Sequence, residues 1–252
     1  MLQIQNIFKE FDGIKAVDDL SFTIEENSIA ALVGPNGSGK TTAFNLISGY
    51  LKPDKGKIFL AGRDITSLNP FRIARLGIGR TFQNIRLFPQ ISVLDNVMLG
   101  LSYETGERFS SALLQTKRMR REEADNIKKA EELLEFVGLS EKRDSPAENL
   151  SHGQRKLLEL ARILALEPKI FLLDEPIAGL FPETRRTMLG LIRTLREKGK
   201  TILFIEHDLN SVMDVAEKVI VLDHGKKIAE GTPEEIKQNK EVLKAYFGKE
   251  SL

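Results

Sequence analysis

The chain of 252 residues contains no cysteine and no tryptophan, and it has no long hydrophobic run. Without cysteine it can form no disulfide, no thiolate metal site and no cysteine nucleophile, and this absence is compatible with a reducing compartment such as the cytoplasm. The longest apolar runs, such as 29–33 and 170–173, are far shorter than the roughly 20 residues of a membrane-spanning helix. Segment 1–12 also lacks the basic and apolar regions of a secretory signal. We therefore expect a chain that neither crosses a bilayer nor is exported.

An excess of charge of one sign is also missing, because 37 Lys and Arg residues stand against 36 Asp and Glu residues. Proteins whose main partner is a nucleic acid usually carry a clear excess of Lys and Arg, so no nucleic-acid partner is expected. Hydrophobic residues make up 41% of the chain, which excludes a collagen-like repeat and a wholly disordered chain. Because no internal repeat or long linker interrupts the sequence, one compact unit is favoured.

Short apolar segments rich in Ile, Val, Leu and Phe alternate with helical patterns, which predicts an α/β fold with buried parallel strands. The clearest of these segments are 29–33, 170–173, 201–205 and 219–222.

Two other regions differ from this pattern. Segments 2–8, 20–24 and 57–60 are shorter or more polar and are separated by turn signals, which predicts an antiparallel edge sheet. From about residue 92 to residue 150 the strand pattern disappears, and 122–137 carries apolar residues at a helical period. A helical insertion is therefore expected there.

Residues 34–42, Gly-Pro-Asn-Gly-Ser-Gly-Lys-Thr-Thr, directly follow the predicted strand 29–33 and match the P-loop pattern G-x-x-x-x-G-K-[ST]. Glycines let backbone N–H groups turn toward a phosphate, and the following helix points its positive end at the same anion. We expect Lys40 to reach the β- and γ-phosphates and the Thr41 hydroxyl to coordinate Mg²⁺. The pattern predicts a binding site for a nucleoside triphosphate.

Two carboxylates, Asp174 and Glu175, follow the apolar segment 170–173. The carboxyl ends of parallel strands are where α/β proteins bind their ligands. We expect the sheet to bring Asp174 beside Thr41, where it holds Mg²⁺ through water, and Glu175 to orient or deprotonate an attacking water. An Asp-Glu pair standing alone would be read as a strand end or a helix cap, and the P-loop upstream favours the catalytic interpretation.

Between these two sites lies Leu150-Ser151-His152-Gly153-Gln154-Arg155, which resembles the LSGGQ signature of ABC-type ATPases. The motif stands about twenty residues before Asp174 and is followed by a helical pattern, as in that family. The resemblance covers nearly the whole chain. It implies one ABC-type ATP-binding domain over 1–252, with a RecA-like P-loop NTPase core (1–91 and 156–252), an antiparallel β subdomain and an inserted α-helical subdomain (92–155).

The resemblance also implies roles for three further residues. Gln83 matches the Q-loop glutamine, which contacts Mg²⁺ or the attacking water, although an isolated Gln is usually a surface amide. His207 resembles the switch histidine that hydrogen-bonds the γ-phosphate, and a purely structural role is the rival interpretation. Phe11 stands where the family stacks an aromatic ring on adenine, and core packing is the competing interpretation for it.

In the family, each of two ATP sites is shared between the P-loop of one chain and the signature of the other. This chain has one of each, so it is expected to act as a dimer with itself or with a second ABC ATPase. The P-loop side of the ATP site is expected to consist of Phe11, Asn36, Gly37, Ser38, Gly39, Lys40, Thr41 and Thr42. The signature side is expected to consist of Ser151, Gly153 and Gln154. The expected Mg²⁺ ligands are Thr41, Gln83 and Asp174, and the expected catalytic residues are Glu175, His207, Gln83 and Lys40.

Two positions depart from the family pattern. His152 replaces the commoner first glycine of the signature, and the phosphate contact is expected to persist because Ser151 and Gly153 remain. Phe181 stands where the family usually has the aspartate that bridges the two subunits. No such role is assigned to Phe181, and how this chain couples its two sites stays open.

Within the family, the segment 79–88, the long insertion and the ending 242–248 resemble the ATPases of branched-chain amino acid importers. This likeness implies a peripheral position on the cytoplasmic face of the membrane. The implied partners are permease subunits and, indirectly, a periplasmic or extracellular solute-binding protein. A histidine at the position of His152 is also found in the related ATPases of urea and amide importers, so this solute class is an alternative. The sequence is further compatible with the ATPase of a lipid or lipopolysaccharide exporter and with a soluble ABC ATPase that acts as an assembly factor.

Overall fold

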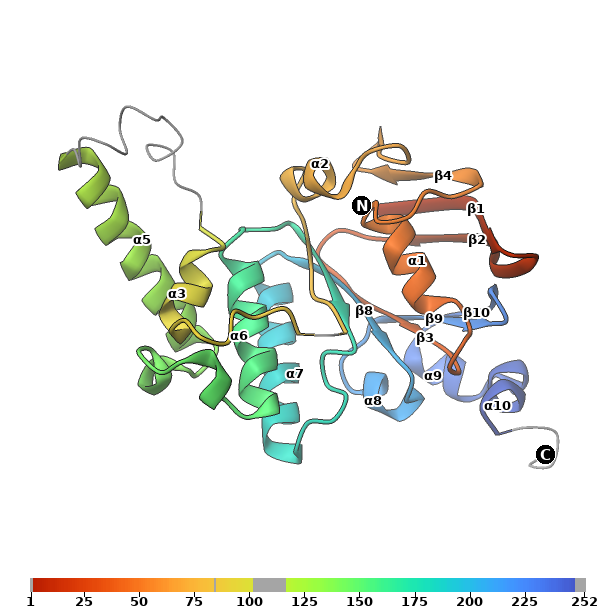
Figure 1. The fold of residues 1–252 in the computed structure, drawn as a ribbon. Helices are drawn as coiled ribbons and strands as arrows, with labels where there is room; N and C mark the ends of the chain where they lie inside the picture. The colour runs from red at the N-terminus through yellow and green to blue at the C-terminus, as the bar shows by residue number, and fades with distance from the viewer. Residues whose placement is uncertain (1, 84, 102–116, 248–252) are drawn as a thin grey trace. The chain divides into compact units, whose positions relative to one another are not determined.

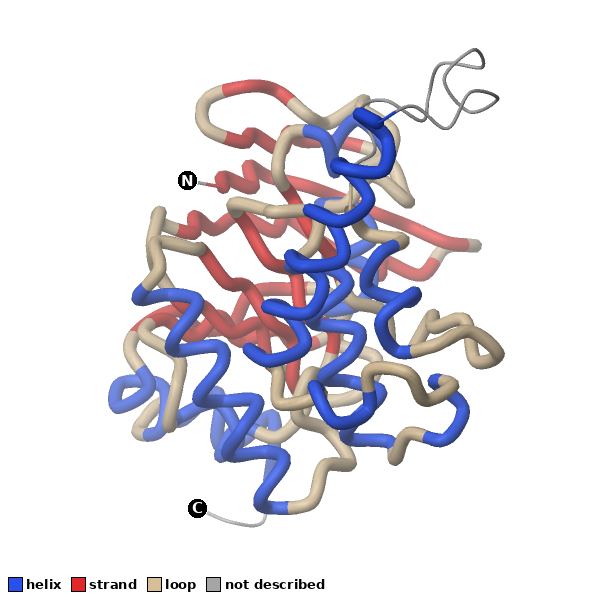
Figure 2. Tube along the Cα trace, turned by 90° about the vertical axis from the view of Figure 1, so that its left-hand side faces the viewer, coloured by secondary structure: helices blue, strands red, loops and turns tan. Residues whose placement is uncertain are grey.

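The computed structural model describes residues 2–83, 85–101 and 117–247. These residues fall into two compact units. The first, here called the sheet unit, lies within Met1–Arg80, Lys169–Ala178 and Arg185–Leu252, and the second, the helical unit, lies within Thr81–Pro168 and Gly179–Thr184. The strands that the structure describes, red in Figure 2, all belong to the sheet unit. The α/β fold class is confirmed.

A six-stranded sheet forms the centre of the sheet unit, in the order β10-β9-β3-β8-β7-β6. Five of its strands run parallel, and β10 is antiparallel to β9. Every residue of β3, β8 and β7 is buried, as expected for strands covered on both faces. Because these three strands are parallel neighbours, the segments that follow them meet at one edge of the sheet. The strands are β3 (Ile29–Val33), β6 (Ile78–Arg80), β7 (Ile170–Asp174), β8 (Thr201–Glu206), β9 (Lys218–Asp223) and β10 (Lys226–Gly231).

The amino-terminal strands form a separate antiparallel sheet of four strands, in the order β2-β1-β4-β5 (Figure 1). This is the antiparallel sheet that the sequence predicts. Its strands are β1 (Leu2–Phe11), β2 (Ile14–Ile24), β4 (Lys55–Leu60) and β5 (Arg63–Asp64).

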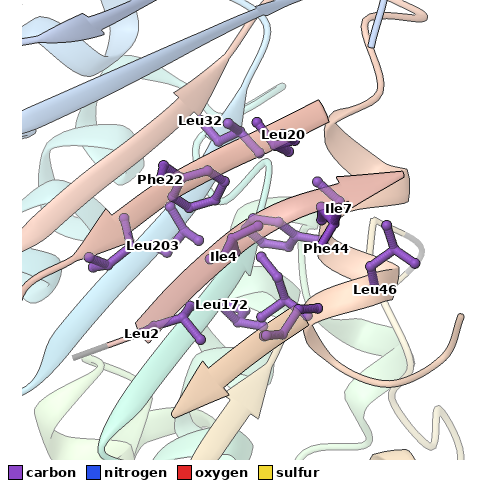
Figure 3. Close-up of a cluster of buried hydrophobic side chains, with 14 of the residues drawn as sticks. Leu2, Ile4, Ile7, Leu20, Phe22, Leu32, Phe44, Leu46, Leu172 and Leu203 are labelled. Carbon is purple, nitrogen blue, oxygen red and sulfur yellow. The ribbon is translucent and has the colours of Figure 1, made fainter. Parts of the chain in front are cut away.

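A cluster of buried apolar side chains joins the two sheets and the helix α1 (Lys40–Ile47). Phe44 of α1 lies among side chains of β1, with Ile4 and Ile7 close to it (Figure 3). A fully buried side chain of this kind contributes about 1.5–3 kcal/mol, so the helix that begins at the P-loop is firmly seated. The other helices of the sheet unit are α2 (Pro70–Arg75), α7 (Pro182–Glu197), which starts in the helical unit, α8 (Leu209–Met213), α9 (Pro233–Lys237) and α10 (Lys240–Phe247).

The helical unit contains the described part of the predicted insertion, and α6 packs on both α3 and α5. These contacts explain why α6 belongs to this unit, which reaches from Thr81 to Pro168. The assignment of the whole chain to one ABC-type domain stays a prediction. The helices of the helical unit are α3 (Val93–Met98), α5 (Lys117–Phe136) and α6 (His152–Leu164), with short 3₁₀ turns at Ser140–Lys142 and Ala147–Asn149.

None of the helices in the described part of the chain combines the length and the apolar character that crossing a membrane requires.

Candidate functional site

The P-loop connects β3 to α1 and is shaped by residues in left-handed backbone conformation. Gly39, the residue before α1, has φ 101°, and a Cβ atom there would lie 2.2 Å from the backbone oxygen of Ala16. Only glycine fits this position. The loop is closed by two backbone hydrogen bonds, from Ser38 N to Pro35 O (3.1 Å) and from Gly225 N to Ser38 O (3.1 Å). The loop is therefore held in shape by its own backbone and by the turn between β9 and β10.

Lys40 is buried at the start of α1, and its ammonium group donates hydrogen bonds inside the P-loop. Its acceptors are the backbone oxygens of Gly34 (2.8 Å) and Pro35 (2.9 Å) and the hydroxyl of Ser38 (3.3 Å). Burial lowers the pKa of Lys40, while the Glu175 carboxylate acts in the opposite direction. A cation is thus fixed within the loop that the sequence assigns to the phosphates.

Most of the other predicted residues on the P-loop side are accessible to a ligand, and Ser38 is the exception. Asn36, Gly37 and Thr41 are exposed, Gly39 and Thr42 are partly exposed, and Ser38 is buried. Phe11, at the end of β1, is 42% exposed, with the Lys9 ammonium 5.5 Å from the centre of its ring. This exposure contradicts the interpretation in which Phe11 packs in the core.

The predicted acidic residues lie at the carboxyl end of β7. Asp174 is its last residue and is buried. Glu175 follows with φ +48°, a conformation that residues other than glycine rarely adopt, and its N–H donates to Ile205 O at 3.1 Å. This hydrogen bond to β8 fixes the backbone of Glu175 at the edge of the sheet.

His207 follows β8 at the same sheet edge, and its side chain is 48% exposed. Its Nδ1 atom lies 3.6 Å from Glu175 Oε1 and 4.0 Å from Glu206 Oε2. Glu206, which the sequence interpretation missed, is 1% exposed and accepts a hydrogen bond from the N–H of Ile177 at 3.1 Å. The sheet unit therefore brings together the P-loop, Asp174, Glu175 and His207, as the sequence predicts for parallel neighbouring strands.

Arg80, the last residue of β6, is a second residue that the sequence interpretation missed. Its Nη2 atom lies 3.4 Å from Asp174 Oδ2, and both side chains are almost fully buried. β6 pairs with β7, so that Arg80 stands opposite Leu172, two residues before Asp174. A charged residue at the end of a short apolar strand is a weak sequence signal, and it does not identify the partner.

The carboxyl-terminal helix α10 also lies beside the P-loop. A cavity of about 480 Å³ separates Asn36 and Gly37 from Lys244 and Ala245. The hydroxyl oxygen of Tyr246, in the same helix, is buried. Burial and, to a smaller extent, the Asp208 carboxylate raise the pKa of Tyr246, which keeps the phenol protonated.

In the helical unit, the signature segment forms the amino-terminal cap of α6. The hydroxyl of Ser151 accepts a hydrogen bond from Gln154 N (3.3 Å), and the side chain of Gln154 accepts one from Ser151 N (2.9 Å). This reciprocal pair is a capping box. A Cβ atom at Gly153 would lie 2.9 Å from the methyl group of Thr184, which favours glycine there. Ser151 and His152 are exposed, and Gly153 and Gln154 are partly exposed, so the segment presents its groups outward.

Gln83 is also in the helical unit, where it is exposed. The neighbouring residue Phe82 donates its N–H to Glu159 Oε1 of α6 at 3.1 Å, and Glu159 is 7% exposed. Asn96 of α3, fully buried, accepts a hydrogen bond from Phe88 N (2.9 Å) and donates one to Phe88 O (3.0 Å). Two buried polar side chains thus bond to the backbone of one residue before Gln83 and of one residue after it. Neither of them belongs to a motif that the sequence interpretation used.

Oxygen ligands for a metal ion are available in the sheet unit, where the Thr41 hydroxyl and the Asp174 carboxylate are hard donors of the kind that Mg²⁺ prefers. Within residues 2–83, 85–101 and 117–247, no three His, Asp or Glu side chains gather closely enough to hold a metal ion by themselves. Mg²⁺ is usually bound by one or two protein ligands together with substrate phosphates.

Comparison with known proteins adds family matches. The ABC transporter family matches residues 17–178, and a family described as "Branched-chain amino acid ATP-binding cassette transporter" matches residues 226–251. The high-affinity branched-chain amino acid transport ATP-binding protein LivG of Salmonella typhimurium is 39% identical over 249 residues, 98% of each chain. The probable LivG of Archaeoglobus fulgidus is 41% identical over 248 residues, 98% of this chain and 95% of the relative.

Solved structures of ATP-binding cassettes are also similar to this chain. The ADP conformation of MJ1267, an ATP-binding cassette of an ABC transporter, has a TM-score of 0.85 and 36% identity, and the match covers 98% of both chains. A dimeric post-hydrolysis state of the cassette MJ0796 bound to ADP and Pi has a TM-score of 0.78 and 27% identity, with 92% of this chain and 99% of that chain covered.

Proposed function

The chain belongs to the ABC transporter family of ATP-hydrolysing subunits, and we propose that it powers the import of branched-chain amino acids. The observation that carries the ATPase function is the meeting of a P-loop, Asp174, Glu175 and His207 at one edge of the parallel sheet. The solute class is supported by the match at residues 226–251 and by relatives that are 37–41% identical over nearly the full chain.

ATP is proposed to bind with its phosphates in the P-loop and its adenine on Phe11. Lys40 places a positive charge inside the loop, where it would attract the phosphates. The backbone N–H groups at the start of α1 form the positive end of the helix dipole and would attract them as well. Thr41 and Asp174, with Gln83, would hold Mg²⁺. The metal ion, when bound, neutralises charge on the β- and γ-phosphates.

Hydrolysis is proposed to depend on Glu175 and His207. Glu175 is a carboxylate of restricted backbone geometry that would orient or deprotonate the attacking water. His207, with Nδ1 3.6 Å from the Glu175 carboxylate, would donate a hydrogen bond to the γ-phosphate. Gln83 is proposed to complete the catalytic set. The hydrogen bond from the N–H of Phe82 to the Glu159 carboxylate fixes the backbone of the residue before it, which supports this proposal.

A complete site is proposed to need a second cassette. Ser151, Gly153 and Gln154 present their groups outward from α6, which suits contact with the γ-phosphate on another chain. The likeness to a dimeric cassette supports this arrangement. The partner is a second copy of this chain or a related ABC ATPase. Closure of such a dimer would exclude water and place fixed dipoles around the transferred phosphoryl group.

The chain is proposed to bind permease subunits at the cytoplasmic face of the membrane. It is peripheral there, and no helix among its described residues could serve as its own membrane span. The permease and a periplasmic or extracellular solute-binding protein would select the solute, which explains why no solute pocket is assigned to this chain.

This function is tested by purifying the tagged full-length chain from native membranes in detergent and identifying its partners by mass spectrometry. Two hydrophobic permeases and a second ABC ATPase are the expected partners. ATPase activity of that complex should rise when branched-chain amino acids and the solute-binding protein are added to the reconstituted system. Recovery of soluble proteins alone, with the chain absent from the membrane fraction, would overturn the transport function.

A further inference from the structure

Arg80 forms a buried ion pair with Asp174, which is one of the proposed metal ligands. The distance from Nη2 to Oδ2 is 3.4 Å, and the side chains are 7% and 3% exposed. A charged group is rarely buried to this degree unless it is paired. The carboxylate proposed to hold Mg²⁺ therefore already has a positive partner from within the chain.

The guanidinium of Arg80 is held by three further groups. Nη1 donates a hydrogen bond to Ser48 Oγ at 2.6 Å. The guanidinium carbon lies 5.7 Å from the ring centre of Phe44 and 5.6 Å from that of Tyr50, distances typical of cation–π contacts. Ser48 is itself fixed, because its hydroxyl donates to Phe44 O at 2.6 Å. Arg80 is thus a preorganised cation that stays in place.

A fixed positive charge beside Asp174 opposes the binding of a bare divalent cation. Two positive charges repel each other strongly where water is largely excluded. Lys40 is a second buried cation of the same site, and its charge interacts with the carboxylates of Glu175, Asp174 and Glu206. The ion pair with Arg80 therefore offsets the attraction that Asp174 exerts on Mg²⁺, and a bound triphosphate adds negative charge to the site.

We propose that Arg80 is a positioning residue that holds Asp174 in place and makes metal binding at this site conditional on bound nucleotide. This inference rests on the proposed function as an Mg²⁺-dependent ATPase. It predicts that free metal ions do not bind at Asp174, whereas the metal–nucleotide complex does.

The test measures Mn²⁺ binding to the full-length chain by electron paramagnetic resonance, with and without ATP. The wild-type chain should bind Mn²⁺ with ATP but not at submillimolar Mn²⁺ without it. Arg80→Met, which keeps an apolar stem and removes the charge, should bind Mn²⁺ without nucleotide at least about 10-fold more tightly than the wild type. Arg80→Lys, which keeps the charge, should behave like the wild type. Arg75→Met removes an exposed arginine of the same unit and should change nothing.

Two results would overturn the inference. The first is tight Mn²⁺ binding by the wild-type chain without nucleotide, which needs no variant and so does not depend on whether Arg80→Met folds. The second is a folded Arg80→Met chain whose nucleotide-free affinity for Mn²⁺ equals that of the wild type. If instead the wild-type chain binds neither ATP nor Mn²⁺ with ATP, the proposed function fails, and this outcome is distinct from the other two.

Discussion

The P-loop and the signature segment begin helices in different units, and they are built in different ways. The P-loop turns its polar groups inward, and the buried ammonium of Lys40 bonds to Gly34 O, Pro35 O and the Ser38 hydroxyl. The signature satisfies its own backbone with a capping box and leaves Ser151 exposed. One region is a preformed cradle, and the other is an outward-facing cap.

This difference separates the contributions of the two regions to function. A cradle that is closed within one unit can bind phosphates in a single chain. An exposed cap contributes only when another chain brings a nucleotide to it. We therefore expect changes in the P-loop to abolish nucleotide binding by the isolated chain, and changes in the signature to affect turnover by the assembled dimer alone.

The largest effect is expected for Lys40→Ala. The change removes the cation proposed to contact the β- and γ-phosphates, and charge-assisted hydrogen bonds contribute about 1.5–3 kcal/mol each. For two such bonds, ATP affinity should fall by about 1,000-fold. Equilibrium dialysis of the isolated chain with labelled ATP measures this loss. Lys240→Ala, at an exposed lysine of α10, is the control and should bind ATP normally. Unchanged affinity in Lys40→Ala would remove the P-loop from the nucleotide site.

Glu175→Gln should separate binding from chemistry. The substitution keeps the size of the side chain and removes its basicity, so ATP binding should persist while hydrolysis slows by at least about 100-fold. Single-turnover hydrolysis and ATP affinity are measured on the same preparation. Glu167→Gln is a matched control, because Glu167 is an exposed glutamate with the same unusual backbone conformation (φ +49°). Turnover at the wild-type rate in Glu175→Gln would exclude Glu175 as the catalytic base.

The parts of the fold that the sequence predicts well are those with strong local patterns. Strand 29–33 matches β3 residue for residue, and the other three predicted parallel strands lie within β7, β8 and β9. β6 was missed because three residues, one of them glycine, show no period. β10 was missed because its residues are mostly polar or exposed, as on an edge strand.

The partners of buried charged side chains could not be predicted in the same way. Arg80 meets Asp174 across 94 residues of sequence, and Phe82 meets Glu159 across 77. Neither contact has a local signal, because each depends on strand order or on helix packing. The P-loop, by contrast, is a local motif whose residue types and spacing are contained in nine positions.

The smallest of the three effects is expected for Ser151→Ala, at the cap of α6. Loss of one hydrogen bond to the γ-phosphate of a partner chain should lower the turnover of the dimer by about 10-fold. ATP affinity of the isolated chain should stay within about 2-fold of the wild type, because the signature is proposed to contact nucleotide only across the dimer. The substitution also removes a helix cap, which costs about 1 kcal/mol of stability.

Ser92→Ala is the control that separates the loss of turnover from the loss of stability in Ser151→Ala. Ser92 caps α3 in the same unit, and its hydroxyl accepts a hydrogen bond from Asp95 N at 3.0 Å, just as Ser151 accepts one from Gln154 N. Both variants should lose a similar free energy of unfolding in urea titrations, while turnover should fall in Ser151→Ala alone. Equal loss of turnover in the two variants would mean that the signature serine acts only as a cap. Weakened ATP binding by the isolated Ser151→Ala chain would contradict the division between a cradle and an outward-facing cap.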